Sequence, residues 1–188
     1  MTVRRAMAGL LIVLATSSAA SAESPAMAPL LKQLDLIAYR AGTTPPAFSG
    51  RTLDARDLSL AGLRGRAVVL NFWASWCQEC RPEMPVLERL HRTLGPRGLA
   101  VVGINARETR ATARRFAADL QLSFPLVLDQ DGKINGLYGV VGLPSTFLIG
   151  RDGRAVALAV GPRDWDAATA RTIIDAMLAE PIPGPDSR

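Results

Sequence analysis

Two cysteines, Cys77 and Cys80, are the only cysteines of the chain, and they are separated by two residues. A purely structural disulfide there would add little stability, because loop-closure stabilisation is smallest for small loops. Structural zinc needs further Cys, His or acidic ligands, and the chain has one histidine, His91. Covalent haem needs histidine directly after the second cysteine, where Arg81 stands. A redox-active pair agrees best with these residues.

The sequence around the cysteines predicts how they are positioned. The apolar stretch 67–73 (AVVLNFW) predicts a buried strand that runs into the cysteines, and a helix is expected after them to about Thr93. Cys77 would then lie at a helix N-terminus, where free N–H groups and the helix dipole stabilise a thiolate. Cys80, one turn further, would be shielded from solvent. One sulfur can then attack while the other resolves, as thiol–disulfide exchange requires.

The rest of the chain predicts an α/β core that is partly parallel and partly antiparallel. Near its start, Leu53 and residues 58–60 are expected to form a small hairpin. Asp164 is expected to act as N-cap of the last helix. Further strands are predicted at 99–105, 125–128, 146–149 and 155–160, and helices at 109–120, 132–138 and 164–178.

The first 22 residues have the features of a cleaved secretory signal. Arg4 and Arg5 precede the apolar stretch 6–15, and Ala20-Ser21-Ala22 is an A-x-A cleavage pattern. An uncleaved anchor is the alternative. Cleavage implies a periplasmic or other extracytoplasmic location, where disulfides persist, and no membrane insertion afterwards. We divide the remainder into an N-terminal helix and linker (23–47), the main domain (48–180) and a flexible tail (181–188).

Composition and charge argue against several partners. The net charge is +5, and removing residues 1–22 takes away two arginines and leaves +3 (5 − 2). Aromatic residues make up 5% of the chain, so a basic surface interleaved with aromatics is not expected, and neither is nucleic-acid binding. Arg107, Arg110 and Arg114 are expected to form a solvated helix face, with docking of an acidic partner as the alternative, and His91 is expected to be exposed. The sequence indicates no metal site and no cofactor.

The stretch FWASWCQEC together with Gly142–Phe147 (GLPSTF) resembles the thioredoxin superfamily. The longer run LRGRAVVLNFWASWCQECRPEMPVLERL is most similar to the exported TlpA/ResA-like thiol–disulfide oxidoreductases. The resemblance covers roughly residues 48–179. It implies a thioredoxin-like fold, with a central mixed β-sheet flanked by helices and an N-terminal β-hairpin extension. It also implies Cys77 as nucleophile and Cys80 as resolving thiol, joined as a disulfide when oxidised.

The resemblance implies further site residues. Leu143-Pro144 matches a cis proline bond that turns a backbone edge toward the sulfurs for a partner chain, with an ordinary trans turn as the alternative. Trp76 is expected to flank the site on the surface rather than lie in the core. Exported relatives place a proton-carrying glutamate at the position of Glu83, whereas Asn71 stands where cytosolic thioredoxins have an aspartate. The alternative for Glu83 is a solvated acid.

The expected function is the reduction of disulfides in exported client proteins. Glu79 lies beside the second cysteine, and a nearby acid disfavours a thiolate, which favours a reductant over a strong oxidant. The resemblance implies clients in cytochrome c maturation or copper-site assembly, and a membrane-bound electron donor. The alternatives are a Cu(I)-binding metallochaperone on the same scaffold and a thiol peroxidase. The peroxidase pattern has threonine three residues before the reactive cysteine, where this chain has Ala74.

Overall fold

A six-stranded mixed sheet forms the centre of the structure, a computed structural model that describes residues 27–182 and 184. The strand order is β1-β8-β7-β4-β5-β6. β4, β5 and β6 are parallel, and β7, β8 and β1 are added through antiparallel pairings. The strands are Ile37–Ala38 (β1), Ala67–Trp73 (β4), Leu99–Ala106 (β5), Leu126–Asp129 (β6), Ser145–Ile149 (β7) and Ala155–Val160 (β8).

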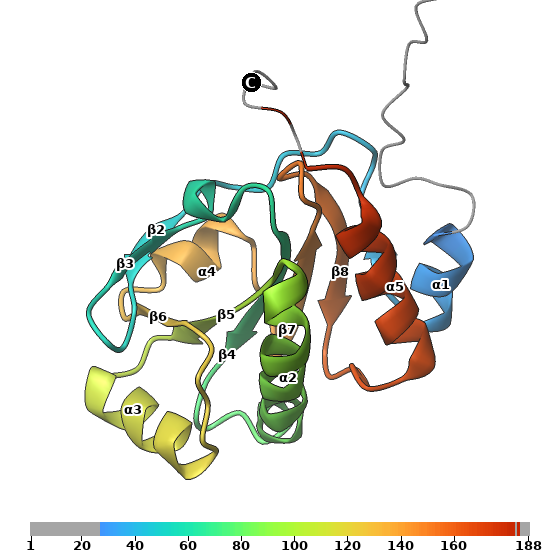
Figure 1. Cartoon of the computed structure of the whole chain (residues 1–188). Helices are drawn as coiled ribbons and strands as arrows, with labels where there is room; N and C mark the ends of the chain where they lie inside the picture. Colours follow the sequence, from blue (N-terminus) through green and yellow to red (C-terminus); the bar gives the residue numbers. More distant parts are fainter. Residues whose placement is uncertain (1–26, 183, 185–188) are drawn as a thin grey trace, which may run out of the picture.

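Helices cover both faces of this sheet. Figure 1 shows α2 and α5 in front of the sheet and α4 behind it. The expected mixed sheet between helices is confirmed. The α-helices are Met27–Gln33 (α1), Cys80–Leu94 (α2), Arg110–Asp119 (α3), Lys133–Leu137 (α4) and Ala168–Ala179 (α5), and the 3-10 turns are Ala61–Leu63 and Gly95–Arg97.

The central strand β4 is buried along its whole length and divides the core into two layers. Successive side chains of a strand point to opposite faces. Leu70 and Phe72 accordingly pack in the layer that contains Ile134 of α4. Val69 and Trp73 pack in the other layer, with α2, α3 and α5. Asn71 shares the face of Val69 and Trp73 by this alternation, so a polar side chain enters the layer beneath α2.

The predicted N-terminal hairpin is present as β2 (Ser49–Arg51) and β3 (Asp57–Ser59). It is fastened to α3 by two arginines. Arg110 Nη1 donates to the carbonyl oxygens of Thr52 and Leu53 at 2.9 and 2.5 Å, and Arg114 Nη2 donates to Leu53 O at 2.7 Å. The expectation of a solvated arginine face is wrong for Arg110, which is partly buried beneath the hairpin, whereas Arg114 is exposed while it donates to the hairpin. Arg107 is exposed but precedes α3, so it is not part of the helix face.

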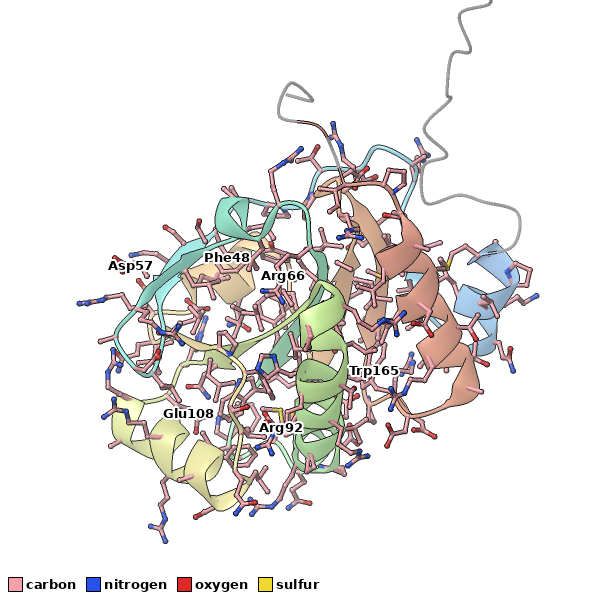
Figure 2. All side chains as sticks on the ribbon, in the orientation of Figure 1. Phe48, Asp57, Arg66, Arg92, Glu108 and Trp165 are labelled. Carbon is pink, nitrogen blue, oxygen red and sulfur yellow. A yellow bond between two sulfur atoms is a disulfide. The ribbon has the colours of Figure 1, made fainter. Side chains whose placement is uncertain are left out.

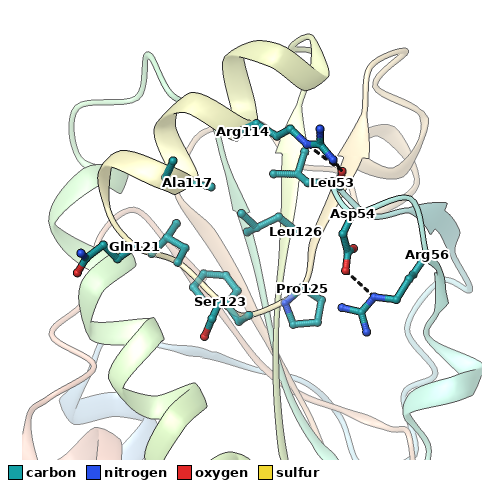
Figure 3. Close-up of a pocket in the computed structure, with 12 residues that line it drawn as sticks. Leu53, Asp54, Arg56, Arg114, Ala117, Gln121, Ser123, Pro125 and Leu126 are labelled. Carbon is teal, nitrogen blue, oxygen red and sulfur yellow. Dashed lines mark hydrogen bonds and ion pairs between the residues drawn. The ribbon is translucent and has the colours of Figure 1, made fainter.

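A pocket of about 370 Å³ lies between α3 and the turn of this hairpin (Figure 3). Arg114 and the ion pair between Arg56 and Asp54, whose Nε and Oδ2 are 2.6 Å apart, contribute charged groups to it. Among the described residues, its lining includes neither cysteine. The pocket is thus separate from the disulfide.

The segment before the hairpin is built into the main sheet. Met27 and Leu31 of α1 are buried, and β1 extends the sheet by pairing Ile37 with Leu158 of β8. The expected N-terminal helix is therefore present but ends at Gln33, and Ile37, which was expected to belong to it, lies in an edge strand. The signal-peptide assignment for residues 1–22 lies outside the described residues.

The last helix begins later than expected. α5 starts at Ala168 and has Ala167 as its N-cap, without a side-chain capping bond. The expectation that Asp164 caps this helix is wrong. Its Oδ1 accepts from the backbone N–H of Asp166 at 3.0 Å and so stabilises the turn that precedes the helix.

Candidate active site

Cys77 and Cys80 form a disulfide at the end of the central strand, with an S–S distance of 2.02 Å. β4 ends at Trp73, a turn follows, and α2 begins at Cys80. The backbone N–H of Cys77 donates to Ala74 O at 3.2 Å within this turn. The strand–turn–helix sequence predicted around the two cysteines therefore brings both sulfurs to one end of the sheet.

The two sulfurs differ in exposure and in hydrogen bonding. Cys77 is 6% exposed and Cys80 is fully buried. α2 begins three residues after Cys77 rather than at it, but the N–H of Cys80, the first residue of the helix, donates to Cys77 Sγ at 3.1 Å. N–H groups at a helix N-terminus favour negative charge on a sulfur they contact. In the reduced protein this N–H would favour a thiolate on Cys77 rather than on Cys80.

The surface beside the disulfide carries exposed apolar side chains. Trp76, next to the outer cysteine, is 66% exposed, as expected. The Leu143-Pro144 peptide bond is cis, also as expected. β7 pairs Ser145 with Phe72, so Pro144 lies at the end of β4 from which the chain continues to the cysteines. Leu143 is partly buried, and Val141 two residues before it is 93% exposed.

Glu83 is buried one helical turn beyond Cys80, with 4% of its surface exposed. Residues three apart lie on the same side of a helix, so both side chains face the layer beneath α2. Glu83 Oε1 accepts from the backbone N–H of Arg163 at 2.6 Å and from Trp165 Nε1 at 3.0 Å. Figure 2 shows Trp165 in the space between α2 and α5. Glu83 is thus an enclosed carboxyl group rather than a solvated acid.

The second oxygen of this carboxyl group, Oε2, has no hydrogen-bond partner among the described residues. Burial raises the pKa of Glu83 to about 7, although the hydrogen bonds from Arg163 and Trp165 and the charge of Arg163 favour the ionised form. Asn71 Nδ2 donates to Thr146 Oγ1 at 2.9 Å, and no described residue donates to Asn71 Oδ1. A protonated Glu83 can donate from Oε2, and Asn71 Oδ1 is an acceptor on the neighbouring strand.

Sequence reasoning missed a carboxylate that holds the turn before the disulfide. Glu108 accepts from the Ser75 backbone N–H at 2.8 Å, from Ser75 Oγ at 2.5 Å and from Asn105 Nδ2 at 2.7 Å. Glu108 lies beside α3 in Figure 2. It ties the ends of β4 and β5 together two residues before Cys77. No spacing rule could have indicated it, because Ser75 and Glu108 are 33 residues apart.

His91 is partly buried against Phe124, with ring centroids 6.2 Å apart, so the expectation that it is exposed is wrong. Over residues 27–182 and 184, no group of three or more His, Cys, Asp or Glu side chains is placed to hold a metal ion. In the same part of the chain, no helix combines the length and apolar character needed to cross a membrane.

Comparisons with known proteins agree with this geometry. The sequence model of the AhpC/TSA family matches residues 41–157. Thiol-disulfide oxidoreductase ResA of Bacillus thuringiensis (strain Al Hakam) is 36% identical over 120 residues, which cover 64% of this chain and 69% of ResA.

Two solved structures are similar along most of their length. One is a thiol:disulfide interchange protein of the thioredoxin family from Chlorobium tepidum TLS, with a TM-score of 0.67 and 30% identity, covering 76% of this chain and 100% of that one. The other is a secreted Mycobacterium tuberculosis disulfide oxidoreductase homologous to Escherichia coli DsbE. Its TM-score is 0.58 and its identity 25%, and the match covers 70% of this chain and 94% of that one.

Proposed function

Because the chain belongs to the AhpC/TSA family and is a thiol–disulfide oxidoreductase of the ResA/DsbE type, we propose that it reduces disulfides of client proteins outside the cytoplasm. The observation that carries the proposal is the pairing of an outer sulfur, Cys77, with a buried sulfur, Cys80, whose helix face also holds an enclosed carboxyl group, Glu83. The clients we propose are exported proteins whose cysteine pairs must be reduced before haem or copper is attached.

The reaction begins with the reduced protein. The Cys77 thiolate attacks one sulfur of the client disulfide, that S–S bond breaks, and the other client sulfur leaves as a thiolate. Cys80 then loses its proton to the Glu83 carboxylate and attacks Cys77 Sγ. The client sulfur that was bonded to Cys77 then leaves as a thiolate, and the Cys77–Cys80 disulfide remains. The client has gained two electrons from the protein, and a membrane-bound thiol donor must restore the dithiol.

The enclosed carboxyl group predicts how the resolving step depends on pH. A base must be ionised to accept a proton, so the rate of resolution should rise as pH increases through about 7, the pKa of Glu83. Glu83→Gln keeps an acceptor for Arg163 and Trp165 but cannot take the proton. We expect this step to slow by about 10²-fold at pH 7 and to lose its inflection near pH 7. Single-turnover kinetics of the mixed disulfide measure both quantities.

The direction of electron flow is a further part of the proposal. Glu79 is exposed next to the buried cysteine. Its negative charge disfavours the thiolate form, which makes the dithiol a better reductant. The protein reduced beforehand should cleave insulin disulfides, and its potential should lie well below about −120 mV, the value of a strong oxidant. Glu79→Gln should shift that potential upward. A potential near the oxidising value would overturn the proposed direction.

Insulin reduction, compared with peroxide consumption and Cu(I) binding, separates the proposed reductase from a thiol peroxidase and from a copper carrier. A thiol peroxidase would consume hydrogen peroxide and oxidise its thiols much faster than it reduces insulin. A copper carrier would bind Cu(I) tightly in the reduced state and exchange disulfides slowly. The position three residues before Cys77 is Ala74, which has no hydroxyl group to bind a peroxide. We therefore expect insulin reduction to exceed peroxide consumption.

The proposed location follows from the N-terminal sequence and the relatives. Residues 1–22 have the pattern of a cleaved secretory signal, and one similar solved structure is of a secreted protein. We propose that the protein acts in the periplasm or an equivalent compartment. Fractionation of cells that express the full chain, with mass determination of its N-terminus, tests both location and cleavage.

A further inference from the structure

Arg163 lies in the connection between β8 and α5, and all of its side-chain nitrogens are engaged. Nε donates to Leu34 O at 2.7 Å, and Nη2 donates to Asp35 O at 2.7 Å and to Asp35 Oδ2 at 2.9 Å. Nη1 donates to the carbonyls of Val160 and Pro162 at 3.2 and 2.9 Å. A planar guanidinium group with every donor satisfied is held in one orientation. The Arg163 side chain thus joins the β8–α5 connection to Leu34 and Asp35 in a fixed orientation.

The partners of Nε and Nη2 belong to the N-terminal segment that precedes the matched family region. Leu34 and Asp35 follow directly after α1, where the last carbonyl groups of a helix lack intrahelical donors. Arg163 supplies donors to these two carbonyls and places positive charge at the negative end of the helix dipole. The segment 27–38 is therefore joined to the β8–α5 connection by polar bonds as well as by packing.

The backbone of the same arginine contacts the buried carboxyl group. The N–H of Arg163 donates to Glu83 Oε1 at 2.6 Å, and Trp165 two residues later donates to the same oxygen. The position of this N–H depends on the course of the β8–α5 connection. That course is held by the side chain of Arg163 on Leu34 and Asp35.

We propose that Arg163 is a positioning residue for Glu83, and that the N-terminal segment 27–38 is through it a working part of the redox site. The inference rests on the proposed function in that Glu83 is taken to exchange the proton of Cys80. The segment 27–38 would have a mechanistic purpose beyond covering the edge of the sheet: it fixes the donors that keep a buried carboxyl group able to ionise.

The groups around Glu83 determine how its ionisation changes when the bonds from the Arg163 side chain to Leu34 and Asp35 are lost. Arg163 is the charged side chain that acts on the carboxyl group from the β8–α5 connection, and Trp165 is a neutral donor to it. Asn71 on β4 is also neutral, and its Nδ2 donates to Thr146. Cys80 lies on the same helix. Removing the guanidinium group takes away the positive charge and frees the connection, so both changes favour the protonated acid. The ionisation of Glu83 should therefore move to higher pH.

The test uses the full-length oxidised protein with ¹³C-labelled glutamate, so that NMR reports the titration of the Glu83 carboxyl carbon directly. Arg163→Gln should raise the titration midpoint by about one pH unit, since a nearby opposite charge typically shifts a carboxyl pKa by that much or more. Arg163→Lys keeps the positive charge but lacks the planar guanidinium group. Its midpoint should lie between those of the wild type and Arg163→Gln. If Arg163→Gln does not fold, the lysine variant alone must still show a raised midpoint.

A matched control is available at the other end of the sheet. Arg151 also clamps backbone carbonyls, donating to Gly65 O at 3.0 Å and to Leu178 O at 2.7 Å. Arg151→Gln should lower stability to a similar extent without moving the Glu83 midpoint. An unchanged midpoint in Arg163→Gln, or an equal shift in Arg151→Gln, overturns the proposal. Neither outcome depends on catalysis, so a failed activity assay of Glu83→Gln is a separate result.

Coupling between two sites must act in both directions. Glu83→Gln exchanges a charge-assisted acceptor for a neutral one at the Arg163 N–H and should loosen the connection it anchors. Amide hydrogen exchange should then be faster by several-fold over residues 30–38, which are 45 or more residues away in sequence. Unchanged protection there contradicts the proposed link between the N-terminal segment and the site.

Discussion

Cys77→Ser should abolish disulfide reduction, whereas Cys80→Ser should still attack a client and remain attached to it. The difference follows from the geometry. Cys77 is the sulfur that the helix N–H contacts and retains 6% exposure, whereas Cys80 is fully buried. Without Cys80 no internal thiol can release the mixed disulfide. The substrate is a test protein that has been reduced and denatured and then reoxidised, so that it carries accessible disulfides. After reaction with it, non-reducing gel electrophoresis should show adducts for Cys80→Ser and none for Cys77→Ser.

The same variants can identify the client. Expression of Cys80→Ser in the native cell envelope should accumulate covalent complexes that are released by dithiothreitol, and mass spectrometry of the released partner names the substrate. The Cys77→Ser/Cys80→Ser double variant is the control for non-specific association. In the reduced wild type, iodoacetamide should modify Cys77 before Cys80. Preferential modification of Cys80 would contradict the assignment of nucleophile and resolving thiol.

Glu83→Gln should stabilise the oxidised protein at pH 8, by up to about 3 kcal/mol. Burial raises the pKa of this group from 4.5 to about 7, and each pH unit is worth about 1.4 kcal/mol. A carboxyl group with a raised folded pKa favours folding fully below pH 4.5 and loses that contribution as pH rises through about 7. Glutamine stays neutral at both pH values and so avoids the cost of burying a charge. Denaturant unfolding at pH 4 and pH 8 measures the difference.

The second buried glutamate of the same helix is the matched control. Glu88 is 6% exposed, and although burial raises its pKa, hydrogen bonds from Ser123, Arg92 and Phe124 lower it overall. Its contribution to stability is present above the unfolded pKa and is lost as pH falls. Glu88→Gln should therefore destabilise the protein at pH 8, by about 1–3 kcal/mol. Equal effects of the two variants would contradict the distinct charge states assigned to them.

The chemistry of the pair and the elements that carry it could be predicted from the sequence. An apolar β-branched run, two cysteines with one helical turn between them and an amphipathic helix are local patterns, and local patterns determine elements. The cis bond before Pro144 and the exposure of Trp76 followed from residues that match the family. Glu83 could be placed on the face of Cys80 by spacing alone.

The charge state of the site was decided by the tertiary structure. The pKa of Glu83 lies near 7 because burial outweighs the bonds that one of its oxygens accepts from Arg163 and Trp165, some 80 positions away, while the other oxygen has no partner in the described part of the chain. The bonds from Arg163 to Leu34 and Asp35 span almost 130 residues. The periodicity of a sequence specifies which side of an element faces the core. Which groups meet there, and how much water they exclude, depends on the packing of elements that are distant in the chain.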